Sequence, residues 1–116
     1  MNISQAMVLN IVSYNLHGYN QGISMLPSLC EGNDILFLQE HWLYPGELGK
    51  LDLVSDKFVS VATSAMSMDM GRGIRHGRPY GGLSILVRKE LLQQFKCITK
   101  CERFICISLG AVLFVN

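Results

Sequence analysis

The sequence predicts an α/β fold, because two short apolar runs at residues 7–14 and 34–40 flank a segment at 23–30 whose apolar residues have helical spacing. The connection between the two runs is long enough to hold a helix and to let the strands lie parallel. The length of 116 residues is typical of one domain. An apolar fraction of 49% with only 16% charged residues excludes a disordered chain and a coiled coil.

The first run, MVLNIVSY, predicts a strand that gives way to a loop at Asn15. In the segment at 23–30, Pro27 suits the first turn of a helix and Gly32 suits its end. The second run, DILFLQE, predicts a strand that finishes at Glu40. Neither strand alternates between apolar and polar residues, which is typical of strands that are buried on both faces.

If these strands are parallel, their carboxyl ends meet at one edge of the sheet. Asn15 and Glu40 then lie side by side, at the kind of edge where open α/β sheets bind their ligands.

The remainder of the chain predicts a second group of strands. A short helix is expected near 47–52 and a helical stretch at 89–95, and a loop is expected at 68–82. The strands are expected at 57–65, 83–88, 97–101, 102–109 and 111–115. Because the last of them ends without a turn or a polar tail, we expect a chain that is cut within a domain.

Charge divides the chain into an acidic part and a basic part. Residues 1–68 carry a net charge of −4 and residues 69–116 a net charge of +5. A site for a cation and a polyanion needs such a division, although short chains also acquire it by chance.

Several features predict an intracellular protein, nuclear or cytoplasmic. The sequence shows neither a secretory signal nor an apolar stretch that could span a membrane. The four cysteines have no CxxC spacing, so we expect buried, reduced thiols with no disulfide partner.

Three blocks of the sequence resemble the endonuclease/exonuclease/phosphatase superfamily, and most of all the apurinic-type endonuclease domain of non-LTR retrotransposons. They are SYNLHGYN at 13–20, ILFLQEHWL at 35–43 and GRPYGGLSILVRK at 77–89. The resemblance implies a four-layer α/β/β/α sandwich, of which residues 1–116 form the amino-terminal part of one domain, truncated after its first half. It also implies DNA as the substrate and a reverse transcriptase domain in the same polyprotein.

The resemblance further implies metal-dependent hydrolysis of phosphodiesters. Glu40 is then the ligand of Mg²⁺, or of Mn²⁺, and Asn15 orients the metal or the phosphate. The structural alternatives are a solvated carboxylate at a strand end and an asparagine that suits a loop. Gln39 is expected either to be buried against the sheet or to donate a hydrogen bond to a residue of the site without contacting the metal itself.

Other residues near these blocks have weaker claims to a role in catalysis. The catalytic histidine of the superfamily belongs to a later block, so His17 and His41 are expected at the rim of the site. Trp42 is expected to pack, with stacking on a base as the alternative.

The basic loop GRGIRHGR at 71–78 suits a nucleic-acid contact. Arg72, Arg75 and Arg78 offer forked donors to phosphate oxygens, and Tyr80 could stack on a sugar or base. The alternatives are a solvated loop and a tyrosine that packs beneath it.

The superfamily's later Tyr, Asp-x-Asn and Ser-Asp-His blocks have no counterpart in this sequence. The chain alone is therefore not expected to hydrolyse phosphodiesters. The alternatives are a member of the superfamily that acts on phospholipid or nucleotide phosphates, a truncated chain that binds nucleic acid without catalysis, and a complete small α/β binding domain.

Overall fold

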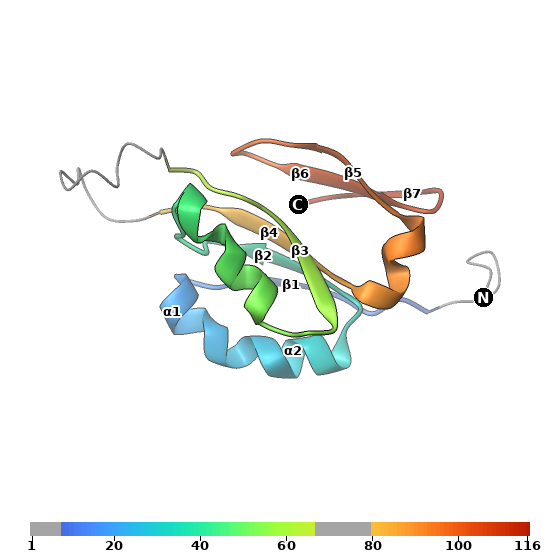
Figure 1. Cartoon of the computed structure of the whole chain (residues 1–116), viewed down its shortest axis with the longest axis horizontal. Coiled ribbons are helices and arrows are strands. Elements are labelled where there is room, and N and C mark those ends of the chain that lie inside the picture. The colour runs from blue at the N-terminus through green and yellow to red at the C-terminus, as the bar shows by residue number, and fades with distance from the viewer. Residues whose placement is uncertain (1–7, 67–79) are drawn as a thin grey trace.

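Two β-sheets face each other, and helical segments cover the outer side of one of them (Figure 1). The computed structural model describes residues 8–66 and 80–116. Within these residues the order of layers is helices, first sheet and second sheet.

The first sheet has four strands in the order β1-β2-β4-β3. Their bounds are β1 (Ile11–Asn15), β2 (Ile35–Gln39), β3 (Phe58–Thr63) and β4 (Leu83–Arg88). β1 and β2 are parallel, as the sequence predicted, and the other neighbours are antiparallel. The helical crossover between β1 and β2 therefore puts the carboxyl ends of both strands at one edge.

The crossover consists of three short helical pieces: α1 (Tyr19–Gly22), the 3-10 turn η1 (Ile23–Met25) and α2 (Leu26–Gly32). Pro27 lies in the first turn of α2 and the helix ends at Gly32, both as predicted. A 3-10 helix η2 (Pro45–Leu53) replaces the short helix expected after β2. Across the described ranges, no helix is both long enough and apolar enough to cross a bilayer.

The second sheet is an antiparallel meander in the order β5-β6-β7. Its strands are β5 (Phe95–Lys100), β6 (Ile105–Leu109) and β7 (Val112–Val115), and the 3-10 helix η4 (Lys89–Gln94) leads into it from β4. The strand predicted to begin at 102 begins at 105, because a turn closed by the Cys101 N–H and the Phe104 carbonyl (2.9 Å) comes first.

Two apolar cores lie on the two faces of the first sheet. Leu36 and Leu38 of β2 pack with Leu26 and Cys30 of α2 on the helix side. Ile35, on the opposite face of β2, packs with residues of β6 between the sheets. The almost wholly apolar sequence of β2 is explained by its central position, covered on both faces. The prediction of burial on both faces was wrong for β1, because β1 is the border strand of the sheet and each of its residues is exposed or half-buried.

The cysteines are less uniformly buried than the sequence suggested. Cys30 is buried on the inner side of α2, whereas Cys97 and Cys101 are exposed and Cys106 is half-buried. The prediction was wrong for Cys97 and Cys101, because β5 and the turn after it lie at the outer border of the second sheet, where nearly every residue is exposed.

Candidate metal and phosphate site

The carboxyl edge of β1 and β2 brings the predicted amide and carboxylate together. Asn15 is the register partner of Gln39, and Glu40 follows directly. The pairing continues beyond the strands, where the Leu16 N–H donates to the Gln39 carbonyl and the Gly18 N–H to the Glu40 carbonyl, each at 2.8 Å. The predicted juxtaposition of Asn15 and Glu40 at one edge is confirmed.

Asn15 is exposed, and its side chain forms a local turn. Its Oδ1 accepts a hydrogen bond from the backbone N–H of His17 at 2.9 Å. Such a turn leaves the second lone pair of Oδ1 and the whole NH₂ group available to another partner. His17 is exposed beside it, as expected of a residue at the rim.

The half-buried Glu40 has one carboxylate oxygen engaged and the other without a donor. Oε2 accepts two hydrogen bonds, from the indole Nε1 of Trp42 and from the backbone N–H of Gly81, both at 2.8 Å. Within residues 8–66 and 80–116, no group donates to Oε1. The side chain is therefore held in one orientation with one oxygen left for a further ligand.

Three non-glycine residues of the described chain have a left-handed backbone, and all three lie at this edge. They are His17 (φ 55°), Glu40 (φ 59°) and Trp42 (φ 60°). This conformation is uncommon for residues with a Cβ, and such residues gather at functional sites. The two turns after β1 and β2 are thus the most unusual backbone in the described structure.

Trp42 packs, as predicted, and it also binds the candidate metal ligand, which was not predicted. Its six-membered ring lies against Gly18, where an added Cβ would come within 2.5 Å of Cε3. The Trp42 and His17 rings are 6.2 Å apart. Gly18 and Trp42 each lie in one of the three sequence blocks, but the sequence did not indicate that the indole N–H of Trp42 would reach Glu40.

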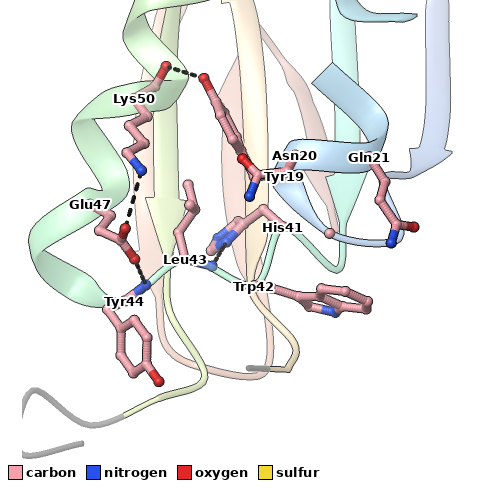
Figure 2. Close-up of a pocket in the computed structure, with 10 residues that line it drawn as sticks. Tyr19, Asn20, Gln21, His41, Trp42, Leu43, Tyr44, Glu47 and Lys50 are labelled. Atoms are coloured by element: carbon pink, nitrogen blue, oxygen red, sulfur yellow. Dashed lines mark hydrogen bonds and ion pairs between the residues drawn. The ribbon is translucent and has the colours of Figure 1, made fainter. Parts of the chain in front are cut away.

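The prediction that His41 lies at the rim was wrong, since its side chain is fully buried. Nδ1 accepts from the Leu43 N–H at 2.9 Å (Figure 2), so Nε2 carries the proton and donates to the Thr63 carbonyl at 2.8 Å. The ring fills the space that a Cβ at Gly82 would occupy, and Gly82 has a φ of 100°. His41 is therefore a structural residue that joins the segment after β2 to the end of β3.

Burial lowers the pKa of His41 below its ordinary value. Hydrogen bonding to the backbone of Thr63 and Leu83 and the charge of Glu40 oppose this shift but do not cancel it. The ring is thus neutral near pH 7, so it supplies no positive charge to the site.

Gln39 and Asn116 form an amide pair between the two sheets. Gln39 Nε2 donates to Asn116 Oδ1 at 2.9 Å and to Ser13 Oγ at 3.0 Å. Asn116 Nδ2 donates to the carbonyls of Leu38 (3.1 Å) and Ser84 (2.9 Å). Gln39 is half-buried and its amide reaches Asn116, which follows the last strand of the second sheet. No pattern in the sequence pointed to this role of Asn116.

Of the residues predicted to contact nucleic acid, the structure describes Tyr80. Arg72, Arg75 and Arg78 lie outside the described residues. Tyr80 is described and is 52% exposed, next to the Gly81 N–H that binds Glu40.

A pocket of about 320 Å³ lies next to this edge without including it (Figure 2). The Lys50 ammonium is 3.1 Å from the Glu47 carboxylate there, and the Tyr19 hydroxyl donates to the Lys50 carbonyl. Trp42 donates to Glu40 at the sheet edge and also lines the pocket, whereas neither Asn15 nor Glu40 lines it. Its lining residues are Gly18, Tyr19, Asn20, Gln21, His41, Trp42, Leu43, Tyr44, Glu47 and Lys50.

The residues at the edge suit a hard divalent cation held by few protein ligands. Mg²⁺ prefers oxygen ligands and keeps several waters, so one or two carboxylates suffice to bind it. Glu40 offers one oriented oxygen and Asn15 an amide oxygen on the neighbouring strand. Among the described side chains, no three His, Cys, Asp or Glu residues gather in one place.

Comparisons with known proteins identify the fold. No protein-family model and no curated protein matches the sequence. The chain is similar to the solved structure of the 3' phosphatase NExo from Neisseria bound to a product DNA hairpin, with 19% identity and a TM-score of 0.58. It is also similar to the 3'-5' exonuclease NExo from Neisseria meningitidis, with 17% identity and a TM-score of 0.50.

These matches cover 94% and 93% of this chain but only 40% of each neighbour, so the chain spans less than half the length of the structures it resembles. At this level of identity the likeness concerns the fold. The predicted α/β fold class is thereby confirmed: within the described residues, the two facing sheets and the helical layer have the fold of these nuclease and phosphatase structures, of which the chain spans a part.

Proposed function

We propose that this chain carries the metal-anchoring side of a Mg²⁺-dependent phosphodiesterase site that acts on DNA, of the retrotransposon endonuclease type. The observation that carries the proposal is the Glu40 carboxylate at the edge shared with Asn15: two N–H groups fix one of its oxygens, and none of the described residues donates to the other. The fold is shared with proteins described as a 3' phosphatase and a 3'-5' exonuclease, one of them bound to DNA, which supports DNA as the substrate.

The roles we assign follow from the chemistry of each group. Glu40 would hold Mg²⁺, or Mn²⁺, through Oε1, and Asn15 would orient a phosphate through its NH₂ group without adding a second negative charge. When bound, a divalent cation stabilises negative charge on the phosphoryl and leaving oxygens. Tyr80 would contact the sugar or base, and the arginines at 72, 75 and 78 would contact the backbone phosphates.

We further propose that the 116-residue chain binds the cation without hydrolysing DNA. In-line hydrolysis also needs a group that activates water on the opposite side of phosphorus. His41, which follows Glu40 directly, does not supply this group, because it is buried and both of its ring nitrogens are hydrogen-bonded.

The test measures cation binding and strand cleavage on the same protein. Mn²⁺ binding, followed by the electron paramagnetic resonance of the free ion, should be lost in Glu40→Gln and retained in Glu47→Gln, whose carboxylate pairs with Lys50 away from the edge. Supercoiled plasmid and a duplex with an abasic site should remain intact with Mg²⁺. Unchanged Mn²⁺ binding in Glu40→Gln would refute the cation site, and nicking that depends on both Mg²⁺ and Glu40 would refute the inactivity of the isolated chain.

A second candidate is a chain that binds nucleic acid without any metal. The net charge of +5 over residues 69–116 supports this candidate, because basic side chains attract the phosphates of DNA without a metal ion. DNA binding that weakens steeply with salt but is unchanged by EDTA and by Glu40→Gln would support this candidate.

A further inference from the structure

We infer that Trp42 is a positioning residue for Glu40, whose indole N–H fixes the carboxylate so that its second oxygen faces a divalent cation. The inference rests on the proposed cation site and names a residue that the chemistry of that site depends on. Trp42 would not touch the cation or the phosphate; it would act through Glu40.

Two donors meet on one carboxylate oxygen, and they come from two different segments. Trp42 belongs to the segment after β2, and Gly81 belongs to the segment before β4. The two segments are tied directly by a backbone hydrogen bond from the Trp42 N–H to the Gly81 carbonyl at 2.9 Å. The two donors therefore form one rigid clamp on Oε2.

The backbone of Glu40 is held by the segment before β4 and by the segment after β1. Its N–H donates to the Gly82 carbonyl at 2.9 Å, and its carbonyl accepts from the Gly18 N–H at 2.8 Å. Because the main chain of Glu40 is held on both sides, only its side-chain torsions can still vary, and the two hydrogen bonds to Oε2 restrict those torsions. A glutamate in water has many rotamers, so a clamp of this kind prepares it for a ligand before the ligand arrives.

Packing alone does not account for a tryptophan at this position. The six-membered part of the ring lies against Gly18, a contact that a phenylalanine could also make. The indole N–H is only a donor, and here it is directed to the carboxylate at 2.8 Å. Trp42 also has a left-handed backbone (φ 60°), a conformation that costs free energy for a residue with a Cβ and that gathers at functional sites.

The expected consequence is weaker cation binding when the donor is removed. Groups that orient a metal ligand usually change metal affinity by about 10–100-fold. Because Gly81 retains its own bond to Oε2, we expect the lower end for Trp42, about 10-fold.

The experiment replaces Trp42 by 3-benzothienylalanine, which keeps the bicyclic shape and has sulfur in place of the N–H. Trp42→Phe is the second variant, Glu40→Gln reports on the cation site itself, and Tyr19→Phe is the matched control. Tyr19 also lines the neighbouring pocket, and its hydroxyl donates to the Lys50 carbonyl rather than to Glu40. Mn²⁺ affinity is measured by electron paramagnetic resonance on the whole 116-residue chain.

A spectroscopic readout reports on the clamp directly. Trp42 is the only tryptophan in the sequence, so the chain has one indole N–H resonance. In the wild type, sub-stoichiometric Mn²⁺ should broaden this resonance and the Gly81 amide before others. In Glu40→Gln without metal, the indole N–H resonance should shift, because its acceptor changes from a carboxylate to an amide.

The inference is supported if the benzothienyl variant and Trp42→Phe both bind Mn²⁺ about 10-fold more weakly while Tyr19→Phe binds normally. Wild-type affinity in the benzothienyl variant overturns it, whether or not Trp42→Phe is impaired, because the N–H would then be irrelevant. If Glu40→Gln keeps wild-type affinity, the proposed cation site itself has failed, and this result is distinguishable from failure of the clamp alone.

Discussion

The two sheets differ in how they are covered and in the chemistry they carry. Helices cover one face of the first sheet and the second sheet covers the other, so β2 and β4 are buried almost throughout (Figure 1). In the second sheet, by contrast, β6 is buried at alternate positions and most residues of β5 and β7 are exposed. The three non-glycine residues with a left-handed backbone in the described chain lie in the turns that follow strands of the first sheet, as does the candidate site.

This difference gives a physical reason for where the site lies. Strained residues such as Glu40 and Trp42 persist only where the surrounding structure holds them firmly. The edge of a sheet that is packed on both faces provides such support. A sheet exposed at its outer strands does not, so the second sheet serves the site mainly by covering the first.

The largest predicted effect tests this contrast in stability. Leu38 of β2 is completely buried, whereas Leu113 of β7 is 64% exposed. Leu38→Ala should lower the free energy of unfolding by about 2–5 kcal/mol, and Leu113→Ala should change it by less than about 0.5 kcal/mol. Urea denaturation of both variants measures this, and equal losses would show that the two sheets contribute alike.

The first sheet was also the part that the sequence predicted best. Apolar runs ending in Asn15 and Glu40, joined by a helical segment, were enough to predict parallel strands and a shared edge. The prediction worked because it depended on periodicity and chain length, which are local properties.

The contacts that build the site were not predictable in this way. His41 was expected at the rim because histidine is polar, but its partner carbonyl at Thr63 is 22 residues away in the sequence. Asn116 bonds to Gln39 across 77 residues, and the left-handed turn at Glu40 alters the direction of the side chains after β2. Such contacts depend on how the elements pack, and a single sequence does not contain that information.

An intermediate effect is expected from the pH dependence of stability. The pKa of His41 is lowered in the folded state, so the unfolded chain binds a proton more readily. The stabilisation from the neutral ring is complete above pH 6.5, the ordinary value, and is lost as the pH falls from there through the folded-state pKa.

Urea midpoints between pH 7.5 and pH 5 check this prediction. The fall should be largely removed in His41→Asn, because asparagine keeps an acceptor and does not titrate, and it should persist in His17→Asn, because His17 is exposed. A fall that is the same in both variants would assign the pH dependence to other groups.

The smallest effect concerns the connection between the sheets, which is made at Gln39 and Asn116. Gln39→Ala and Asn116→Ala should each lower the free energy of unfolding by about 1 kcal/mol, since each leaves a partner without its hydrogen bond. Together they should cost less than the sum by about 0.5–1 kcal/mol, because the bond they share can be lost only once.

Asn33→Ala is the control: its side chain bonds to the Leu29 carbonyl within the helical layer, so its effect should add to that of Gln39→Ala. If the Gln39 and Asn116 effects are also additive, the amide pair does not couple the sheets. The second sheet would then cover the first through its apolar contacts alone, such as the edge-on pair of Phe37 and Phe114.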